Sequence, residues 1–354
     1  MSWLIYGANG YTGELVARLA VASAERPILA GRNRAAVESL ANDLGLEYRA
    51  FDLDDPAAID AGLQDVDVVA HCAGPFSRTS APMVAGCLRR GVHYLDLTGE
   101  IDVFEAVYDQ HEAAKASGVT LVPGVGFDVV PTDYLLARLH AELPTATHAE
   151  AALISRGGFS GGTIRSVVEG MRAGGQVRTN GRLAAARVGH EVRTLRLDAR
   201  SQTVISVPLG DVSSGYRATG IPNIINFTNI PAGRVAARFA PITKRALSTG
   251  WIYRTTDQAI AKFLTGPSER RRARTRSDLW AELRDDNGRQ VSTAIRVPNT
   301  YDFTAHSMLH AVRRMLAGGV PTGALAPSQA FGADFLTTIP GIEVTTLPNP
   351  EVHS

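Results

Sequence analysis

The chain begins MSWLIYGANGYTGELVARLA (residues 1–20), and this stretch predicts how its first part folds. The apolar run at 3–6 is typical of a buried strand, and a helical pattern begins at 12. Three glycines spaced three residues apart join the two. Such a turn lets the backbone approach a pyrophosphate, which a helix N-terminus attracts. The residues expected to bind a dinucleotide here are Gly7, Asn9, Gly10, Tyr11, Thr12 and Gly13.

The same order of strand and helix recurs through the first third of the chain. Strands are predicted at 3–6, 27–30, 47–52, 67–71, 93–97 and 120–122. Helices are predicted at 12–22, 35–44, 56–63, 81–90 and 103–116. Alternation with short connections is typical of a parallel, doubly wound sheet that binds ligands at the carboxyl ends of its strands. We therefore expect an α/β chain with an N-terminal Rossmann domain.

The end of the second strand favours NADP(H) over NAD(H). An NAD-preferring domain places an acidic residue there for the ribose hydroxyls. This chain has AGRNR (residues 30–34) and no acid. Arg32 could pair with a 2′-phosphate, with Asn33 or Arg34 assisting. The alternative interpretation is that the two arginines are solvated loop charges.

The next two strand ends offer further cofactor contacts. Asp52 could contact the adenine amino group, or it could cap the helix that opens near Pro56. After the fourth strand, a turn of small residues leaves backbone room beside the cofactor ribose and nicotinamide. The turn could equally be an ordinary helix entry without a ligand. Its expected contact residues are Ala73, Gly74, Pro75 and Phe76.

Length and composition set the broad class. With 354 residues, two domains are expected. A formal net charge of +1 gives no field that would attract nucleic acid or an anionic membrane. No apolar run is long enough to span a bilayer and no signal-like segment opens the chain, so we expect a cytoplasmic protein. Two cysteines without a C-x-x-C pair predict neither a disulfide framework nor a zinc site.

Strict alternation fades from about residue 149. Strands are predicted at 149–155, 191–197, 203–207, 223–229, 279–284 and 291–297, and helices at 162–173, 234–247 and 252–264. The residues between the last two strands, DDNGR (285–289), are typical of a hairpin turn. This pattern predicts an α+β domain with a mixed sheet. The run ERRRARTR (269–276) is interpreted as a solvated loop, or alternatively as a site for an acidic substrate group or carrier protein.

The opening GANGYTG (residues 7–13) also resembles short-chain dehydrogenases of the extended type. Those enzymes use a Tyr-x-x-x-Lys pair for proton transfer. No tyrosine of this chain has a lysine four residues later, so that chemistry is excluded, whereas a non-catalytic relative of these enzymes is not.

Several segments occur in the order and spacing of another family. They are GPFSRTSAPMVAGCLRRGVHYLDLTGE (74–100), GVGFDVVPTD (124–133), FSGGT (159–163) and Tyr301-x-x-Thr304-Ala305. In these segments the chain resembles the saccharopine dehydrogenase-like family of NADP-dependent oxidoreductases. The similar branch also holds trans-acting enoyl reductases. True saccharopine reductases have a different second domain, so the family name does not identify the substrate.

The resemblance implies a division of the chain and an assembly. We expect a dinucleotide-binding domain at 1–142, an α+β substrate and dimerisation domain at 143–316, and a segment at 317–354 that returns to the first domain. The resemblance also implies a possible homodimer.

Candidate proton donors lie near the carboxyl ends of the later strands. By position they are His71, Tyr94, Asp96, Glu100 and Asp128. His71 and Tyr94 are interpreted mainly as packed residues. Asp96 and Asp128 are predicted to handle the proton that accompanies hydride transfer. Asp128 could instead cap the helix that follows near Pro131.

The predicted function is NADPH-dependent reduction of a C=N, C=O or conjugated C=C bond. The substrate is a small molecule or a carrier-bound chain. One alternative is an enoyl reductase that acts in trans on carrier-bound acyl chains. The other is a redox-inert NADP(H)-binding regulator. No spacing of metal ligands and no Ser-His-Asp order is present, so no metal site or hydrolase is expected.

Overall fold

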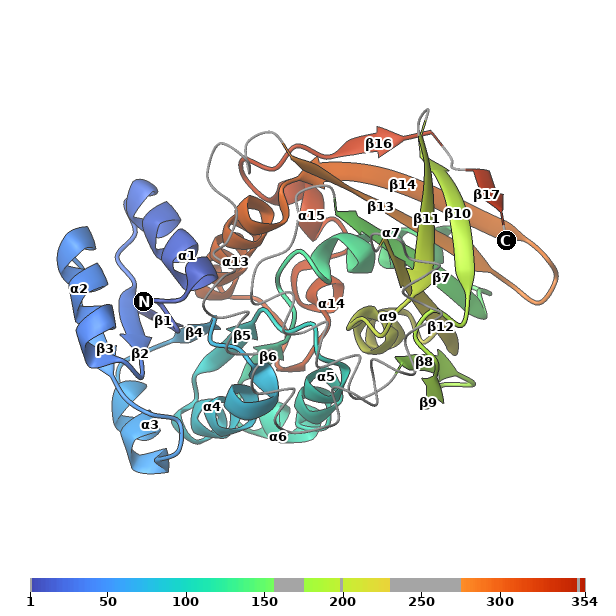
Figure 1. Cartoon of the computed structure of the whole chain (residues 1–354). Coiled ribbons are helices and arrows are strands. Elements are labelled where there is room, and N and C mark those ends of the chain that lie inside the picture. Colours follow the sequence, from blue (N-terminus) through green and yellow to red (C-terminus); the bar gives the residue numbers. More distant parts are fainter. Residues whose placement is uncertain (1, 156–174, 198–199, 230–274, 349–350, 354) are drawn as a thin grey trace, which may run out of the picture. The chain divides into compact units, whose positions relative to one another are not determined.

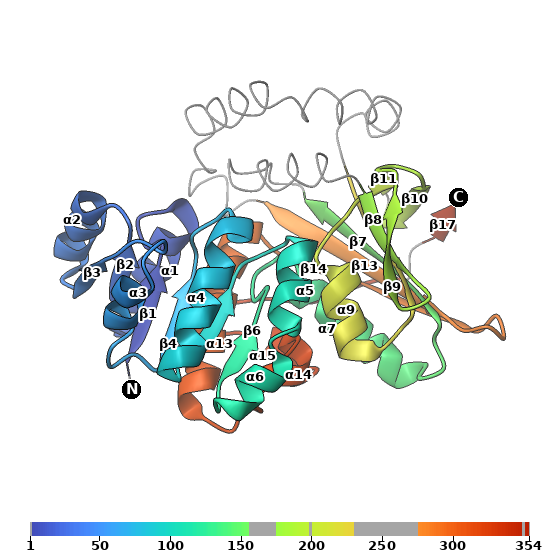
Figure 2. The same ribbon diagram turned by 90° about the horizontal axis from the view of Figure 1, so that it is seen from below.

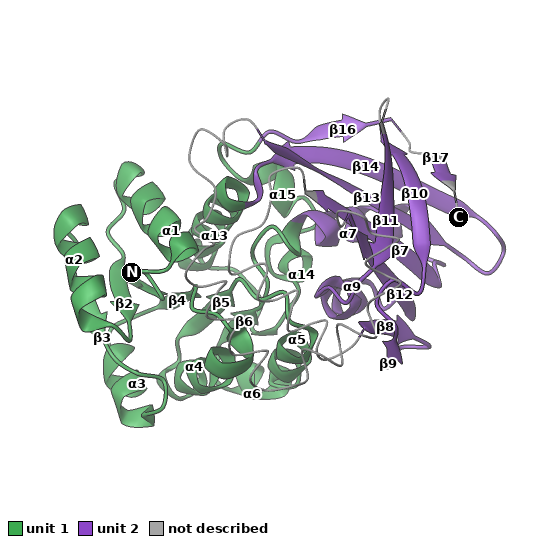
Figure 3. Ribbon diagram, viewed as in Figure 1, with its two compact units in different colours: residues 1–130, 301–342 green, residues 131–300, 343–354 purple. Residues whose placement is uncertain are grey.

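The computed structural model describes residues 2–155, 175–197, 200–229, 275–348 and 351–353 (Figure 1). The chain forms two compact units (Figure 3). The first contains Met1–Val130 and Tyr301–Ile342, and the second contains Pro131–Thr300 and Glu343–Ser354. These boundaries differ from the sequence prediction, which placed them after 142 and 316. The difference at the second boundary arises from helix α13 (Thr300–Ala317), whose side chains pack within the first unit.

The first unit is built on a seven-stranded parallel sheet. Its strand order is β15-β6-β5-β4-β1-β2-β3. The order reverses between β1 and β4, the point at which open α/β sheets bind ligands. The strands are β1 (Trp3–Tyr6), β2 (Ile28–Gly31), β3 (Tyr48–Ala50), β4 (Val68–His71), β5 (His93–Asp96), β6 (Thr120–Val122) and β15 (Gly323–Ala324). The predicted Rossmann fold is therefore confirmed.

Helices connect these strands and cover the sheet. They are α1 (Tyr11–Ala22), α2 (Arg34–Leu44), α3 (Pro56–Gly62), α4 (Phe76–Arg90), α5 (Ile101–Tyr108) and α6 (His111–Ala116). Helix α4 begins earlier than the predicted 81. The helix predicted over 103–116 is two helices, because the Gln110 N–H bonds the Val107 carbonyl and closes α5 with a tight turn.

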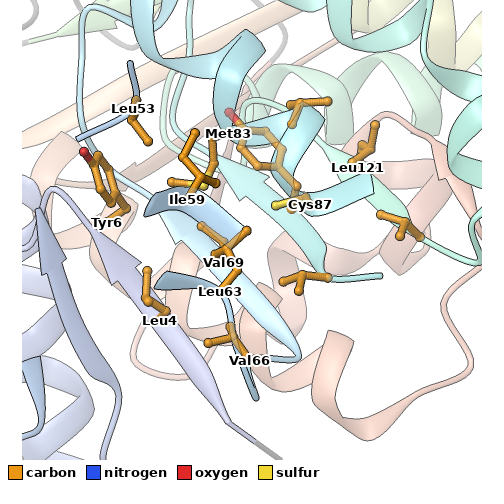
Figure 4. Packing of buried hydrophobic residues seen from close by; sticks show 14 of the residues in the cluster. Leu4, Tyr6, Leu53, Ile59, Leu63, Val66, Val69, Met83, Cys87 and Leu121 are labelled. Carbon is orange, nitrogen blue, oxygen red and sulfur yellow. The ribbon is translucent and has the colours of Figure 1, made fainter. Parts of the chain in front are cut away.

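Helices α3, α4, α5 and α6 lie along one face of the sheet (Figure 2). Their apolar side chains form one core with the sheet (Figure 4). Ile59 of α3 and Leu63, which follows the end of α3, lie with Met83 and Cys87 of α4 in this cluster. All four side chains are at most 1% exposed. The buried strands and these helices hold the carboxyl edge of the sheet as a rigid frame for the site.

Helix α13 packs along the first unit at several points. Its Tyr301 ring meets the Tyr11 ring of α1 edge to face, 5.1 Å between centroids. Its Ser307 hydroxyl donates to the Val125 carbonyl at 2.7 Å. Arg313 pairs with Glu25, just beyond the end of α1, at 2.6 Å. The chain then continues into β15, α14 (Pro327–Phe331) and α15 (Phe335–Thr338).

The second unit is an α+β arrangement around a mixed sheet, as predicted. The sheet order is β16-β14-β13-β7-β12-β11-β10-β17, with β7 and β12 parallel and the other neighbours antiparallel. The strands are β7 (His148–Ser155), β8 (Gly175–Thr179), β9 (Arg182–Ala186), β10 (Val192–Leu197), β11 (Arg200–Ser206), β12 (Asn223–Thr228), β13 (Arg276–Arg284), β14 (Gln290–Pro298), β16 (Thr345–Leu347) and β17 (Glu351–His353). Helices α7 (Val130–Glu142) and α9 (Asp211–Thr219) complete its described secondary structure.

The predicted hairpin turn between β13 and β14 is confirmed. Asp285 Oδ1 accepts the N–H groups of Asn287 and Arg289, at 3.0 and 2.9 Å. The hairpin of β8 and β9 was not predicted, because its residues show no clear alternation of apolar and polar side chains. Among the described residues, no helix is long and apolar enough to cross a membrane.

Several predicted features lie outside the described residues. They are the helices at 162–173, 234–247 and 252–264, the FSGGT segment and residues 269–274 of the basic run.

Candidate functional site

The glycine turn after β1 has no room for side chains at two of its three glycines. Gly7 adopts φ +82°, and a Cβ there would lie 2.8 Å from the Ala73 backbone nitrogen. A Cβ at Gly13 would collide with the Gly7 carbonyl oxygen. At Gly10 the only atom close to a Cβ would be the Gly7 carbonyl oxygen, at 3.2 Å. The turn therefore packs tightly against the β4 end and leaves space above Gly10, as a pyrophosphate requires.

The N-terminus of helix α1 differs from those of the next two helices, α2 and α3. Its N-cap is Gly10, and no side chain caps it. By contrast, Asn33 caps α2 by accepting the Ala36 N–H, and Asp55 caps α3 by accepting the Ala57 N–H. A helix that starts at an uncapped glycine directs its positive end at whatever lies before it. The N-terminus of α1 is therefore suited to a phosphate.

The end of β2 supplies a cation beside that turn. Arg32 is exposed, and in the part of the chain that the structure describes no carboxylate pairs with it. Asn33 has only its side-chain NH₂ group left for a ligand, because its Oδ1 caps α2. Asn9 lies close to the β2 end, since a Cβ at Gly31 would be 3.1 Å from its Oδ1. Arg32 is thus available to pair with a 2′-phosphate, and that contact stays a prediction.

Asp52 does not cap the following helix, so that alternative is wrong. Asp55 occupies the capping position instead. Asp52 Oδ1 accepts the N–H groups of Leu53 and Asp54, at 2.7 and 3.4 Å, and the residue is exposed. Its second oxygen is left for an adenine contact, which stays a prediction.

The turn after β4 is fixed at both of its ends. The Thr79 hydroxyl donates to the Ala73 carbonyl at 2.6 Å. The N–H groups of Phe76 and Ser77 donate to the Glu100 carboxylate, each at 2.9 Å. Gly74 between these anchors is exposed. Sequence patterns did not predict the Glu100 contact, because the two segments are more than 20 residues apart in the chain.

His71 and Tyr94 are both buried in the core of the first unit. His71 Nε2 lies 3.0 Å from Thr79 Oγ1, and burial lowers the pKa of the imidazole to about 3. Its ring packs against Tyr6, Phe76 and Tyr94. The Tyr94 hydroxyl donates to Asp96, and burial raises the pKa of the phenol well above its ordinary value. Neither group is placed to exchange protons with a ligand.

The carboxylate of Asp96 is fully buried and hydrogen-bonded. Its Oδ1 accepts the Thr98 and Gly124 N–H groups at 2.9 and 2.8 Å, and its Oδ2 accepts the Tyr94 hydroxyl at 2.8 Å. Burial raises the pKa of Asp96 to about 6, and the hydrogen bonds oppose that rise. Asp96 therefore ties the loop after β5 to the loop after β6.

The surroundings of the Asp128 carboxylate differ from those of Asp96. It is partly exposed, and no described residue donates a hydrogen bond to it. Capping of α7 by Asp128 is therefore not observed. Burial alone raises the pKa of Asp128 to about 6. The Asp128 carboxylate lies beside the loop after β5, since a Cβ at Gly99 would be 3.5 Å from its Oδ2.

Within the described ranges, no group of three or more His, Cys, Asp or Glu side chains could hold a metal ion. The site built by the first unit is thus a glycine turn with an uncapped helix, an unpaired arginine and one free carboxylate. This donor set fits a phosphorylated dinucleotide.

Comparison with known proteins agrees with that geometry. Residues 3–122 match the family model of the saccharopine dehydrogenase NADP binding domain, and this match supports NADP(H) binding by the segment. The chain is 33% identical over 183 residues to a trans-acting enoyl reductase from Mycobacterium leprae, covering 48% of this chain and 44% of that relative. It is 30% identical over 184 residues to a trans-acting enoyl reductase from Mycobacterium tuberculosis, with the same two shares of 48% and 44%. The chain therefore spans under half the length of these relatives.

A solved structure shares the fold of both units, so the expectation that true saccharopine reductases have a different second domain is wrong. It is the apo saccharopine dehydrogenase (L-Glu forming) from Saccharomyces cerevisiae, with a TM-score of 0.63, 12% identity and full coverage of both chains. At this identity the likeness concerns the fold alone.

Replacing each of the two aspartates with asparagine is expected to change stability in opposite directions. The pKa of Asp128 is raised above its unfolded value of 3.8, so folding stability falls as the pH rises through the interval from about 4 to about 6 and stays lower above it. Asp128→Asn removes this partly buried charge. We expect it to raise the free energy of unfolding on the order of 1 kcal/mol at pH 8, and to have little effect at pH 4.

Urea denaturation of the Asp128→Asn variant at both pH values measures this. Asp96→Asn is the matched comparison, because an amide cannot replace both accepting oxygens of Asp96. We expect Asp96→Asn to destabilise the protein at pH 8. A destabilising Asp128→Asn at pH 8 would contradict the assignment of Asp128 as an unpaired carboxylate.

Proposed function

We propose that this chain is an NADPH-dependent reductase of a conjugated C=C bond in an acyl chain, with Asp128 as the proton donor. The observation that carries the proposal is a partly exposed carboxylate, to which no described residue donates a hydrogen bond, at the same sheet edge as the glycine turn. The two relatives are trans-acting enoyl reductases, which supports an enoyl substrate carried by another protein. Reduction of a C=O or C=N bond is the broader form of the same proposal.

The residues that would hold the cofactor come from successive strand ends of the first unit. The N-terminus of α1 receives the pyrophosphate, and Arg32 pairs with the 2′-phosphate. Asp52 contacts the adenine amino group. The Ala73–Phe76 turn borders the ribose and nicotinamide. When bound, NADPH supplies a hydride to the β-carbon of the conjugated bond.

Asp128 supplies the other half of the reduction. As the β-carbon gains the hydride, negative charge develops toward the thioester oxygen and the α-carbon. Asp128 donates its proton at the α-carbon, so a saturated acyl chain leaves and the carboxylate regains a proton from water. Asp96 ties the loop after β5 to the loop after β6, which carries Asp128. The second unit is proposed to bind the substrate.

Substrate class is the first test. NADPH carrying deuterium at both C4 positions is incubated with an enoyl thioester, a ketone and an imine, and the products are analysed by mass spectrometry. We expect deuterium at the β-carbon of the enoyl product, and higher rates when the acyl chain is attached to a carrier protein. Tight NADPH binding without deuterium transfer to any substrate would indicate a redox-inert regulator instead.

Arg32→Ala tests the cofactor preference. Loss of a charge-assisted phosphate contact is expected to raise the Kd for NADPH about 10- to 100-fold and to leave the Kd for NADH unchanged. Calorimetric titration with both cofactors measures this. Arg90→Ala, in the last turn of α4, is the control and should match the parent chain. Equal losses for NADPH and NADH would contradict the 2′-phosphate contact.

Asp128→Asn tests the proton donor. A general acid contributes about 10²- to 10⁴-fold to a rate, so kcat should fall by that order while the Kd for NADPH stays constant. Because the pKa of Asp128 is about 6, kcat of the parent chain should decline above pH 6 as the acid loses its proton. The variant should lack this decline. Asp102→Asn, an exposed acid of α5, is the control. Full activity of Asp128→Asn would contradict the assignment.

We also propose that the protein is a cytoplasmic homodimer that associates through its second unit. The expectation comes from the family resemblance. Sedimentation at micromolar concentration should give twice the chain mass, and a monomer mass would contradict the dimer.

A further inference from the structure

Helix α4 has no capping side chain from its own sequence neighbours. Its N-cap is Pro75, which forms no side-chain hydrogen bond. Instead, Glu100 Oε1 accepts the Phe76 N–H and Glu100 Oε2 accepts the Ser77 N–H, each at 2.9 Å. One carboxylate thus satisfies the first two N–H groups of α4. It also places a negative charge at the positive end of that helix.

The carboxylate of Glu100 is aimed at α4 by the loop after β5. Asp96 accepts the Thr98 N–H at 2.9 Å, and Thr98 Oγ1 accepts the Glu100 N–H at 3.1 Å. Glu100 is the N-cap residue of α5, yet its side chain does not cap that helix. Two consecutive hydrogen bonds from a buried strand end therefore orient Glu100 toward a helix that precedes it in the chain.

The turn before α4 has little freedom to shift. The Thr79 hydroxyl holds the Ala73 carbonyl, and Glu100 holds the Phe76 N–H. Ala73 also lies against the glycine turn, because a Cβ at Gly7 would be 2.8 Å from both the Ala73 nitrogen and the Ala73 Cβ. A displaced α4 start would move Ala73 either into Gly7 or away from it.

We propose that Glu100 is a positioning residue for cofactor binding. Its carboxylate fixes the Ala73–Phe76 turn for the nicotinamide half of NADP(H), and it closes the N-terminus of α4 to phosphate. The pyrophosphate is thereby directed to α1, whose N-terminus has no side-chain cap. The inference rests on the proposed function only in assigning the turn to the nicotinamide half. Glu100 acts through the Phe76 and Ser77 N–H groups and transfers no proton.

Ligand titrations test the selectivity of this effect. NADPH and 2′,5′-ADP, which lacks the nicotinamide half, are titrated into the parent chain, Glu100→Ala and Glu100→Gln. We expect Glu100→Ala to raise the Kd for NADPH about tenfold and the Kd for 2′,5′-ADP less than twofold. Glu100→Gln keeps one accepting oxygen and should fall between. Glu112→Gln, an exposed acid of α6, should match the parent chain.

Hydrogen exchange without cofactor tests the cap itself. Exchange of the Phe76 and Ser77 amides should become about tenfold faster in Glu100→Ala and stay unchanged in Glu112→Gln. Unchanged exchange together with unchanged NADPH affinity would overturn the proposal. So would equal losses for NADPH and 2′,5′-ADP, which mean general damage. If the parent chain bound no NADPH, the proposed function would fail, while the exchange result would still decide whether Glu100 caps α4.

Discussion

The contact between Gly7 and Ala73 is the constraint on which the cofactor edge of this protein depends. Strands β1 and β4 are paired up to Tyr6 and His71, and the Cys72 N–H still bonds the Tyr6 carbonyl at 2.8 Å. One residue later the two chains turn to opposite faces of the sheet, and Gly7 passes Ala73 with no room for a Cβ. Because the left-handed φ of Gly7 also sets the direction of α1, a side chain here would displace both the helix and the turn after β4.

Four helices begin at this edge, and their N-termini differ in whether a side chain caps them. Asn33 and Asp55 cap α2 and α3 from within their own turns, and Glu100 caps α4 from the loop after β5. Only α1, among these four, begins at a glycine without a side-chain cap. The edge therefore offers a phosphate one preferred helix, and Arg32, which pairs with no carboxylate of the described residues, lies just after the neighbouring strand β2. A dinucleotide that follows this charge pattern has one favourable orientation.

The Rossmann architecture could be predicted from the sequence because apolar runs and glycine spacing are properties of short segments. Strand β1 and strand β6 begin and end where the apolar runs predict, and the glycine turn follows from spacing alone. The role of Glu100 could not be predicted in this way. Its partners precede it by more than 20 residues, and only the register of β4 and β5, which pairs His71 with Asp96, brings the two loops together. Helix α4 starts earlier than its apolar pattern for the same reason, since a remote carboxylate stabilises its first turn.

The two predicted catalytic aspartates also looked equivalent in sequence, and their surroundings separate them. Both have a pKa raised to about 6 by burial, so the pKa alone does not select one. A proton donor must regain its proton in every turnover, which requires access to solvent or ligand. Asp96 is 0% exposed, and both of its oxygens already accept hydrogen bonds. Asp128 is partly exposed and has no such partner in the described part of the chain. Asp128 can therefore cycle its proton, whereas protonation of Asp96 would weaken the bonds that hold the loops after β5 and β6 together.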